Sequence, residues 1–121
     1  MADEPFCFTT SPRSKAGVSI VKISGPLTLK HLFGFQEAFR AMKPPILILD
    51  LAECIYMDSA GLGLIMNQFV SCQNGKRRLI LTGVNYRVQA LLDLTKVSSV
   101  LEQFSSTEVA EASLQDLTRA I

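Results

Sequence analysis

The chain has 121 residues, of which 48% are hydrophobic, and its 12 basic and 11 acidic residues give a formal net charge of +1. This length suits one domain, and the hydrophobic fraction is too high for a disordered chain. The near-neutral charge argues against a nucleic-acid-binding surface, which needs a concentrated basic excess. No apolar run approaches the roughly 18 residues of a membrane span, and the first residues do not resemble a signal peptide. The sequence therefore predicts a cytoplasmic protein that is not inserted in a membrane.

The cysteines and the histidine do not predict a metal site. Cys7, Cys54 and Cys72 are widely spaced and odd in number, so we expect thiols in a reducing compartment rather than a disulfide framework or a metal centre. His31 is the only histidine and is expected at the surface or at a helix end. The densest basic run, 76–78, is expected to be a solvated segment leading into a strand rather than a phosphate-binding patch.

The first part of the chain predicts a hairpin, a helix and a buried strand. Two strands over 5–10 and 17–25 are expected to pair as the hairpin. Apolar residues at helical spacing then predict a helix over 29–42, which the prolines that follow bring to an end. The continuously apolar stretch 46–51 predicts a strand that is buried on both faces, as in a parallel sheet covered by helices.

The second part continues with helices and strands in alternation. The expected elements are a helix over 59–73 ended by Asn74-Gly75, a strand over 77–84 and a helix over 86–94 capped by Asn85. A brief strand near 100–101 and a last helix to 121 follow. Thr107 could cap this last helix, one face of which carries Ala110, Leu114, Leu117 and Ile121. Alternating strands and helices after residue 45 imply parallel strands joined by right-handed crossovers. We therefore expect one α/β domain over 1–121, with a mixed β-sheet (N-terminal hairpin plus parallel strands) and about four helices.

The stretch MDSAGLG, residues 57–63, lies where a predicted strand feeds the next helix, which is where functional groups gather in α/β sheets. Gly61 and Gly63 fall in the first turns of that helix, where each costs up to about 1 kcal/mol relative to alanine. One interpretation is structural: Asp58 or Ser59 caps the helix, and the glycines let it pack tightly on the sheet. The other is functional: Ser59 is exposed and phosphorylated, and the glycines keep the surface open to another backbone or to an anion.

An enzyme fits this stretch less well. DSAGLG is not a G-x-S-x-G nucleophile elbow, and the chain contains neither a Walker A phosphate-binding loop nor a G-x-G-x-x-G fingerprint. The lone His31 precedes the serine, and no second histidine is present to act as a base. We therefore predict no catalytic residue.

Several motifs resemble one known family. ILILDLAECIYMDSAGLGLI, residues 46–65, resembles the central signature of the STAS family, in particular the small bacterial antagonists of anti-sigma factors. LILTGVN (79–85) and VQALLDLT (88–95) resemble the strand and helix that come next in the family, and ISGPLT (23–28) resembles its early strand and turn. The central motif is fairly specific, the flanking ones are weak alone, and the resemblance covers nearly the whole chain.

The resemblance implies a component of a partner-switching pathway. In the family, the unmodified antagonist binds an anti-sigma factor that is also a serine kinase of the histidine-kinase-like ATPase fold, and this frees the sigma factor. Phosphorylation of the serine that matches Ser59 ends the binding, and a serine phosphatase, usually metal-dependent, resets the protein. ATP and its metal would then belong to the kinase, and this chain would carry no cofactor. The residues implied to contact the partner are Thr28, Met57, Asp58, Ser59, Ala60, Gly61, Leu62, Gly63 and Asn85.

One departure from the family and two alternatives stay open. Thr28, followed by Lys30 and His31, stands where the family commonly has an acid that helps to meet the kinase, which bears on the identity of the partner or the strength of that contact. The alternative function is a STAS domain that never switches, such as a subunit of an ABC-type lipid transporter. A homodimer is also open, through apolar residues that are more often simply part of a core: Phe6, Phe8, Phe33 and Tyr56.

Overall fold

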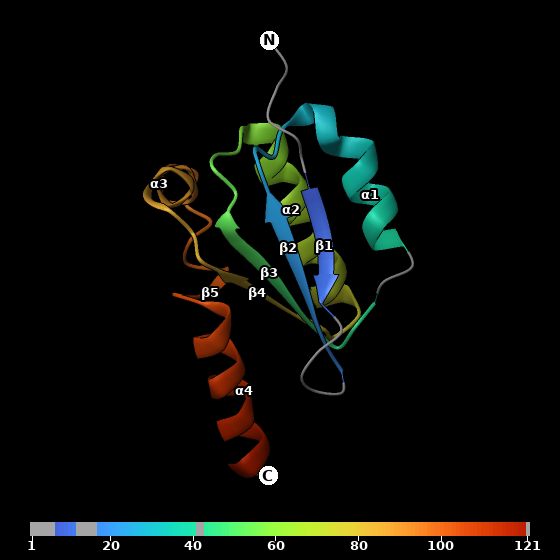
Figure 1. Cartoon of the computed structure of the whole chain (residues 1–121), viewed down its shortest axis with the longest axis vertical. Helices are drawn as coiled ribbons and strands as arrows, with labels where there is room; N and C mark the ends of the chain where they lie inside the picture. Colours follow the sequence, from blue (N-terminus) through green and yellow to red (C-terminus); the bar gives the residue numbers. More distant parts are fainter. Residues whose placement is uncertain (1–6, 12–16, 41–42, 121) are drawn as a thin grey trace.

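Five strands form one sheet in the order β1-β2-β3-β4-β5 in the computed structural model, which describes residues 7–11, 17–40 and 43–120 (Figure 1). β1 is antiparallel to β2, and β2 to β5 are parallel to one another. The predicted mixed sheet and the predicted order of elements are confirmed. In chain order the elements are β1 (Cys7–Ser11), β2 (Val18–Ser24), the 3-10 helix η1 (Leu29–His31), α1 (Leu32–Arg40), β3 (Ile46–Glu53), α2 (Ser59–Asn74), β4 (Arg78–Thr82), α3 (Tyr86–Leu94), β5 (Glu102–Phe104) and α4 (Thr107–Ala120).

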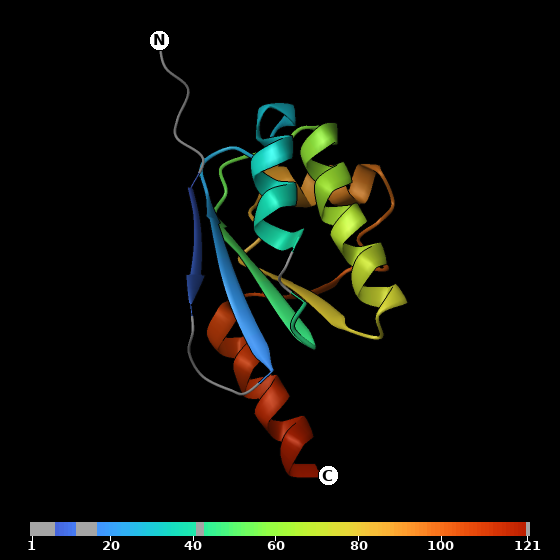
Figure 2. The ribbon, with the colours of Figure 1, turned by 90° about the vertical axis from the view of Figure 1, so that its right-hand side faces the viewer.

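The helices cover the two faces of the sheet unequally. α1, α2 and α3 lie on one face and α4 lies on the other (Figure 2). Alternate residues of β3 enter the two cores: Leu47, Leu49 and Leu51 join the larger one, and Ile48 joins the smaller one against α4. This two-sided burial explains why β3 is continuously apolar, as the sequence predicts.

The first helix begins later than predicted. Residues 29–31 form η1, in which the His31 N–H donates to the Thr28 carbonyl at 2.9 Å, and α1 begins only at Leu32. A contact between residues three apart tightens the chain into a 3-10 turn, and such turns are common at helix starts. Residues 41–42 of the predicted helix lie outside the described residues.

The end of the chain corrects two further predictions. The last strand lies at 102–104 rather than near 100–101, where Val100 is in an exposed turn. The capping contact of α4 comes from Ser106, whose Oγ accepts from the Val109 N–H at 3.2 Å. Thr107 instead places its hydroxyl 3.1 Å from that of the buried Thr82, which ties α4 to β4. Ala110 and Leu114 are buried as predicted, whereas the side chains of residues 115–121 lie outside the description.

The basic run 76–78 ends α2 and leads into β4. The left-handed residue at this corner is Lys76, with φ 58°, whereas Gly75 has φ −92°. Arg77 donates through Nη2 to the Ser71 hydroxyl at 3.0 Å, and Arg78 forms a two-pronged ion pair with Glu102. The run leads into a strand as predicted, but Arg77 and Arg78 are half-buried and bonded within the chain, so they are less solvated than expected.

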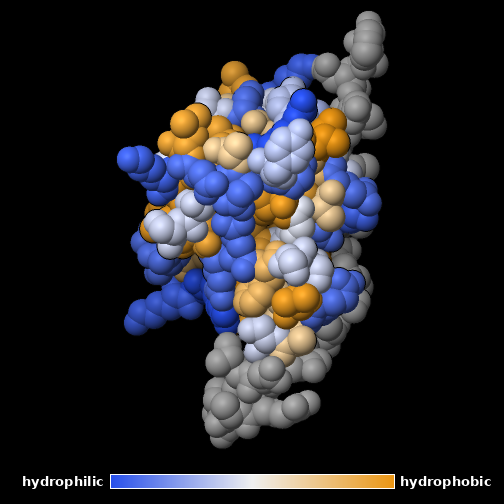
Figure 3. Space-filling model, turned by 90° about the vertical axis from the view of Figure 1, so that its left-hand side faces the viewer, coloured by the Kyte–Doolittle hydropathy of each residue, from blue (hydrophilic) through white to orange (hydrophobic). Residues whose placement is uncertain are grey.

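Exposed apolar side chains are scattered over the side that carries α3 and α4. Figure 3 shows hydrophobic side chains there in several separate groups, divided by hydrophilic ones. Scattered apolar groups of this kind are normal on a protein surface. Within the part of the chain that the structure describes, no helix has the length and apolar character required to cross a membrane.

The two described cysteines are expected to react slowly with thiol reagents. Cys54 and Cys72 are free and buried, and burial raises the pKa of Cys54 from 9.0 to about 11 and also raises the pKa of Cys72. Because the thiolate is the reactive form, a Cys7→Ser variant should show no fast reaction with a chromogenic disulfide reagent at pH 8, and two fast thiols in urea. A fast stoichiometric reaction of the folded variant would contradict this burial.

Candidate functional site

Three loops meet at the carboxyl edge of the parallel strands. Residues 25–28 follow β2, 54–58 follow β3 and 83–85 follow β4, and η1, α2 and α3 begin directly after them. Figures 1 and 2 show the starts of these helices gathered at one end of the sheet. In open α/β sheets this edge is where ligands and partners are bound. Four of the nine predicted site residues fall in these loops, and the other five form the start of α2.

The start of α2 separates the capping group from the candidate modification site. Asp58 is the N-cap: its Oδ1 accepts from the Gly61 N–H at 2.8 Å, and its carbonyl accepts from the Leu62 N–H at 2.9 Å. Ser59 is the first helical residue and is exposed. Among the described residues, none forms a hydrogen bond with the Ser59 hydroxyl. Of the two candidate caps, Asp58 therefore does the capping, and the hydroxyl of Ser59 is left at the surface.

Gly61 allows one loop to lie directly against the first turn of α2. The Leu27 N–H donates to the Tyr56 carbonyl at 3.0 Å, and the Leu27 carbonyl accepts from the Asp58 N–H at 3.3 Å. A Cβ at position 61 would lie 2.1 Å from that Leu27 carbonyl oxygen. The expectation that Gly61 keeps the surface bare is therefore wrong, because the backbone that approaches it belongs to this chain. At the exposed Gly63, by contrast, an added Cβ would meet no atom within 4 Å.

Asn85 joins the second and third loops. Its Oδ1 accepts from the Val88 N–H at 2.9 Å, so it caps α3 as predicted. Its Nδ2 donates to the carbonyls of Cys54 at 3.0 Å and Ile55 at 3.2 Å. The side chain thus fixes the loop that leads to Ser59 as well as its own helix.

Thr28 and His31 form a small polar turn beside the α2 start. The Thr28 N–H donates to His31 Nδ1 at 3.2 Å, and the Thr28 hydroxyl lies 3.4 Å from the same nitrogen. The pKa of His31 is lowered from its usual 6.5, mainly by burial and then by the positive charge of Lys30, whereas Asp58 acts in the opposite direction. The turn is held beside the cap of α2, because Leu27, the residue before Thr28, pairs with Met57 and accepts from the Asp58 N–H.

The predicted contact residues divide by exposure. Met57, Gly61 and Leu62 are buried, so they pack beneath the exposed residues and are not accessible to a partner. Thr28, Asp58, Ala60 and Asn85 are half-buried, and Ser59 and Gly63 are exposed. The structure brings all of them to the same edge, around the start of α2.

The sequence names only part of the apolar side chains that surround this edge: Phe33 and Tyr56 appear there as candidates for a homodimer contact, whereas Leu29 and Tyr86 do not. Leu29, expected on the inner face of a helix, is 63% exposed in η1. Phe33 is 80% exposed in α1, and Tyr86 is 83% exposed at the start of α3. Tyr56 is also exposed, whereas Phe6 and the side chain of Phe8 lie outside the description. Of these residues only Leu29 fits the helical period that the sequence predicts for 29–42, which assigns it to a core.

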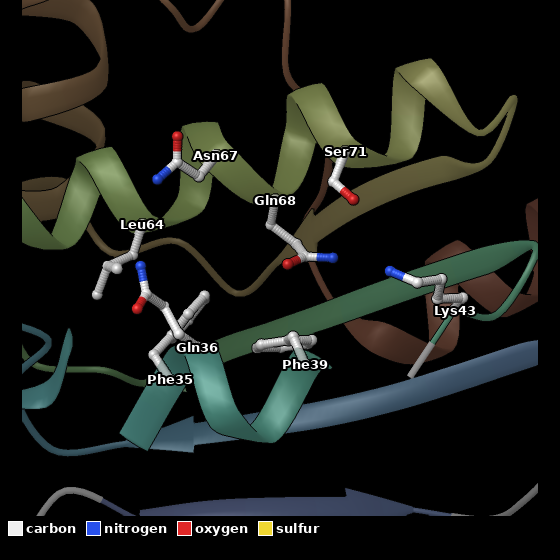
Figure 4. A pocket seen from close by; sticks show the side chains of 8 residues that line it. All are labelled: Phe35, Gln36, Phe39, Lys43, Leu64, Asn67, Gln68 and Ser71. Atoms are coloured by element: carbon white, nitrogen blue, oxygen red, sulfur yellow. The ribbon is translucent and has the colours of Figure 1, made fainter. Parts of the chain in front are cut away.

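A separate groove lies between α1 and α2 (Figure 4). Its volume is about 200 Å³, and its floor includes the rings of Phe35 and Phe39, whose centroids are 4.7 Å apart. Figure 4 shows the side chains of Gln68 and Lys43 directed into the space between the helices. The α2 residues that line it stand in the middle and second half of the helix, away from Ser59, so the groove is not part of the loop edge.

Comparison with known proteins agrees with this architecture. The model of the STAS domain family matches residues 10–111. The anti-sigma-B factor antagonist of Listeria monocytogenes is 33% identical over 66 residues, which are 54% of this chain and 58% of that protein. The anti-sigma-B factor antagonist of Staphylococcus epidermidis is 28% identical over 92 residues, 74% of this chain and 85% of that protein. The matched segment thus spans little more than half the length of the Listeria relative.

Solved structures share the fold at low sequence identity. An anti-sigma factor antagonist from Mycobacterium paratuberculosis superposes with a TM-score of 0.78 at 19% identity, covering 94% of this chain and 99% of the other. The antagonist SpoIIAA, a Bacillus cell fate determinant, superposes in its unphosphorylated form with a TM-score of 0.73 at 15% identity, covering 95% and 98%. With the family model matching most of its length, the chain belongs to the STAS domain family.

Proposed function

We propose that this chain is an anti-sigma factor antagonist whose binding is switched by phosphorylation of Ser59. One observation carries the proposal: the hydroxyl of Ser59 is exposed at the first position of α2, while Asp58 performs the capping. The serine can therefore be modified without loss of the contact that starts the helix. A phosphate there changes the surface and leaves the fold in place.

The location of Ser59 favours a phosphate electrostatically. A phosphoserine brings a charge of about −1.5 to −2, and the N-terminus of a helix carries about half a positive charge. The same phosphate would stand next to the carboxylate of Asp58, so it would present a concentrated negative charge to any partner docked on this edge. A partner fitted to the neutral hydroxyl would then be expelled.

The surroundings of Ser59 suit a protein partner. The exposed apolar side chains of Leu29, Phe33 and Tyr86 belong to η1, to α1 directly after it, and to the start of α3. Exposed apolar residues beside a polar centre are typical of protein interaction sites. The partner that we propose is an anti-sigma factor that is also a serine kinase of the histidine-kinase-like ATPase fold, with a serine phosphatase that resets the switch.

The comparisons support the same role. The two curated relatives carry the name anti-sigma-B factor antagonist, a regulatory and not an enzymatic description. SpoIIAA, which shares the fold, has been solved in an unphosphorylated and in a phosphorylated form. The role of this chain would then be to bind and release its partner, with the chemistry carried out by the kinase and the phosphatase.

A pull-down from the native host with Ser59→Ala and Ser59→Asp baits tests the proposal. The Ala bait is expected to retain an ATPase-fold kinase and the Asp bait to lose it, when bound proteins are identified by mass spectrometry. Because Asp58 is the cap, Ser59→Ala should change the free energy of unfolding by no more than about 0.5 kcal/mol. If Ser59 itself were the cap, the same substitution would cost about 0.5–2 kcal/mol.

A matched control tests whether the negative charge has to be at position 59 to prevent binding. Ser99 is exposed in the turn before β5, so Ser99→Asp adds the same charge away from the loop edge and should leave capture unchanged. Equal capture of one partner by the wild type and by both Ser59 baits would refute the switch. If that partner were a set of transporter subunits, the edge would be a permanent joint instead.

A further inference from the structure

The turn that contains His31 is fastened to the segment that contains Ser59. Leu27 pairs with Met57 as a parallel bridge, and its carbonyl accepts from the Asp58 N–H. The absence of a side chain at Gly61 lets this carbonyl lie against the first turn of α2. The next residue along the chain is Thr28, which bonds to His31. A change of charge at the start of α2 therefore acts on a turn that is held next to it.

The hydrogen bonds of this turn determine the state of the imidazole. His31 Nδ1 accepts from the Thr28 N–H at 3.2 Å, so in this arrangement Nδ1 carries no proton and the neutral ring is protonated on Nε2. A second proton on Nδ1 would face the Thr28 N–H and end that bond. The Thr28 hydroxyl oxygen, 3.4 Å from Nδ1, is placed to accept from it instead.

Burial and the nearby charges together favour the neutral form of the His31 ring. Lys30, on η1, and burial both lower the pKa of His31, and Asp58, at the start of α2, raises it. Lys30 and Asp58 therefore act on the pKa of the ring in opposite directions. A phosphate on Ser59, the residue after Asp58, would add a larger negative charge on the same side.

We propose that His31 senses the phosphate on Ser59: when Ser59 is phosphorylated, the ring takes up a proton from solvent at Nδ1, releases the Thr28 N–H and donates to the Thr28 hydroxyl. The proposal rests on the modification of Ser59 proposed above and concerns its consequence within the chain. η1 carries the exposed Leu29, and Phe33 follows in the first turn of α1. The phosphate would then alter a part of the partner surface that it does not touch.

A nuclear magnetic resonance titration of the single histidine tests this directly. Phosphoserine is incorporated at position 59 during synthesis, so that no kinase is needed, and the ring signals of His31 are followed against pH in the modified and unmodified proteins. The pKa of His31 is expected to be higher in the modified protein by about one unit or more, the usual effect of a nearby opposite charge. Phosphorus signals recorded in parallel follow the ionisation of the phosphate, with which the ring titration is coupled.

Two matched proteins complete the test. Phosphoserine at the exposed position of Gln73 adds the same charge about 21 Å further along α2, beyond the screening length of about 8 Å, and should leave the His31 pKa unchanged. His31→Asn keeps an acceptor for the Thr28 N–H but does not titrate. In that variant the phosphate-dependent shift of the Thr28 amide signal should disappear.

The outcomes are distinct from those of the pull-down. An unchanged His31 pKa in the protein with phosphoserine at position 59 would overturn the proposal, as would a Thr28 shift that persists in His31→Asn. Because the phosphate is installed directly, these results hold whether or not a kinase is captured. A raised pKa with no captured kinase would leave the sensing intact and refute only the proposed partner.

Discussion

Replacing Gly61 by alanine is expected to destabilise the protein by roughly 3 kcal/mol, at the upper end of the usual cost of forcing atoms into a packed site. The new Cβ would lie 2.1 Å from the carbonyl oxygen and 2.9 Å from the carbonyl carbon of Leu27. These are backbone atoms, which cannot rotate away as the end of a side chain can. The better helix propensity of alanine, worth up to about 1 kcal/mol, offsets only part of this cost.

Gly63→Ala is the matched control, because it makes the same substitution two residues later in the same helix. No atom lies within 4 Å of a Cβ at that position, so the variant should gain up to about 1 kcal/mol from propensity alone. Urea unfolding followed by circular dichroism compares the two. If Gly61→Ala were as stable as Gly63→Ala, the close approach of Leu27 to α2 would be wrong.

The structure therefore requires glycine at position 61 but not at position 63. The structural interpretation of Gly61 holds in part: its missing side chain allows close packing, but against the loop that follows β2 and not against the sheet. Gly63 is exposed and meets no such neighbour, so the structure leaves it as an open position on the proposed docking surface. A substitution at Gly61 would reduce partner binding by loosening the fold, and only a substitution at Gly63 tests the surface itself.

Local patterns were sufficient for much of the fold. The continuous apolar run of β3 predicts burial on both faces, which the two cores confirm. Asn85 was predicted to cap α3, because asparagine before an apolar period is a common start signal and the contact to Val88 is local. Such features depend on neighbours within a few residues, so they are visible in the sequence.

Features that depend on distant contacts were not predictable. Leu27 and Gly61 are far apart in the sequence, and no local pattern indicates that the carbonyl of one lies against the other. Ser106 and Thr107 are both common cap types, and only the structure shows that Ser106 caps α4 while the hydroxyl of Thr107 contacts Thr82 of β4. Leu29 fits a helical period but is turned outward by η1.

Asn85→Ala is expected to cost about 3 kcal/mol, because one side chain supplies three contacts. Loss of the α3 cap costs about 0.5–2 kcal/mol, and each hydrogen bond to the carbonyls of Cys54 and Ile55 contributes about 0.5–1.5 kcal/mol. Those carbonyls belong to the loop that leads to Ser59. We therefore expect the variant to lose partner affinity as well as stability, although Asn85 is only half-buried at the edge of the site.

Asn85→Asp distinguishes the two tasks of this side chain. A carboxylate still accepts from the Val88 N–H and suits the positive end of α3, but it cannot donate to the two carbonyls and repels them. If the hydrogen bonds to the loop contribute to stability, urea unfolding should give Asn85→Asp a clearly lower free energy of unfolding than the wild type. Gln89→Ala is the control, because it removes a single exposed contact to Asp93 in the same helix. Its free energy of unfolding should stay within about 0.5 kcal/mol of the wild-type value. Wild-type stability of Asn85→Asp would mean that Asn85 is only a cap, and that the loop before Ser59 is held by Leu27 alone.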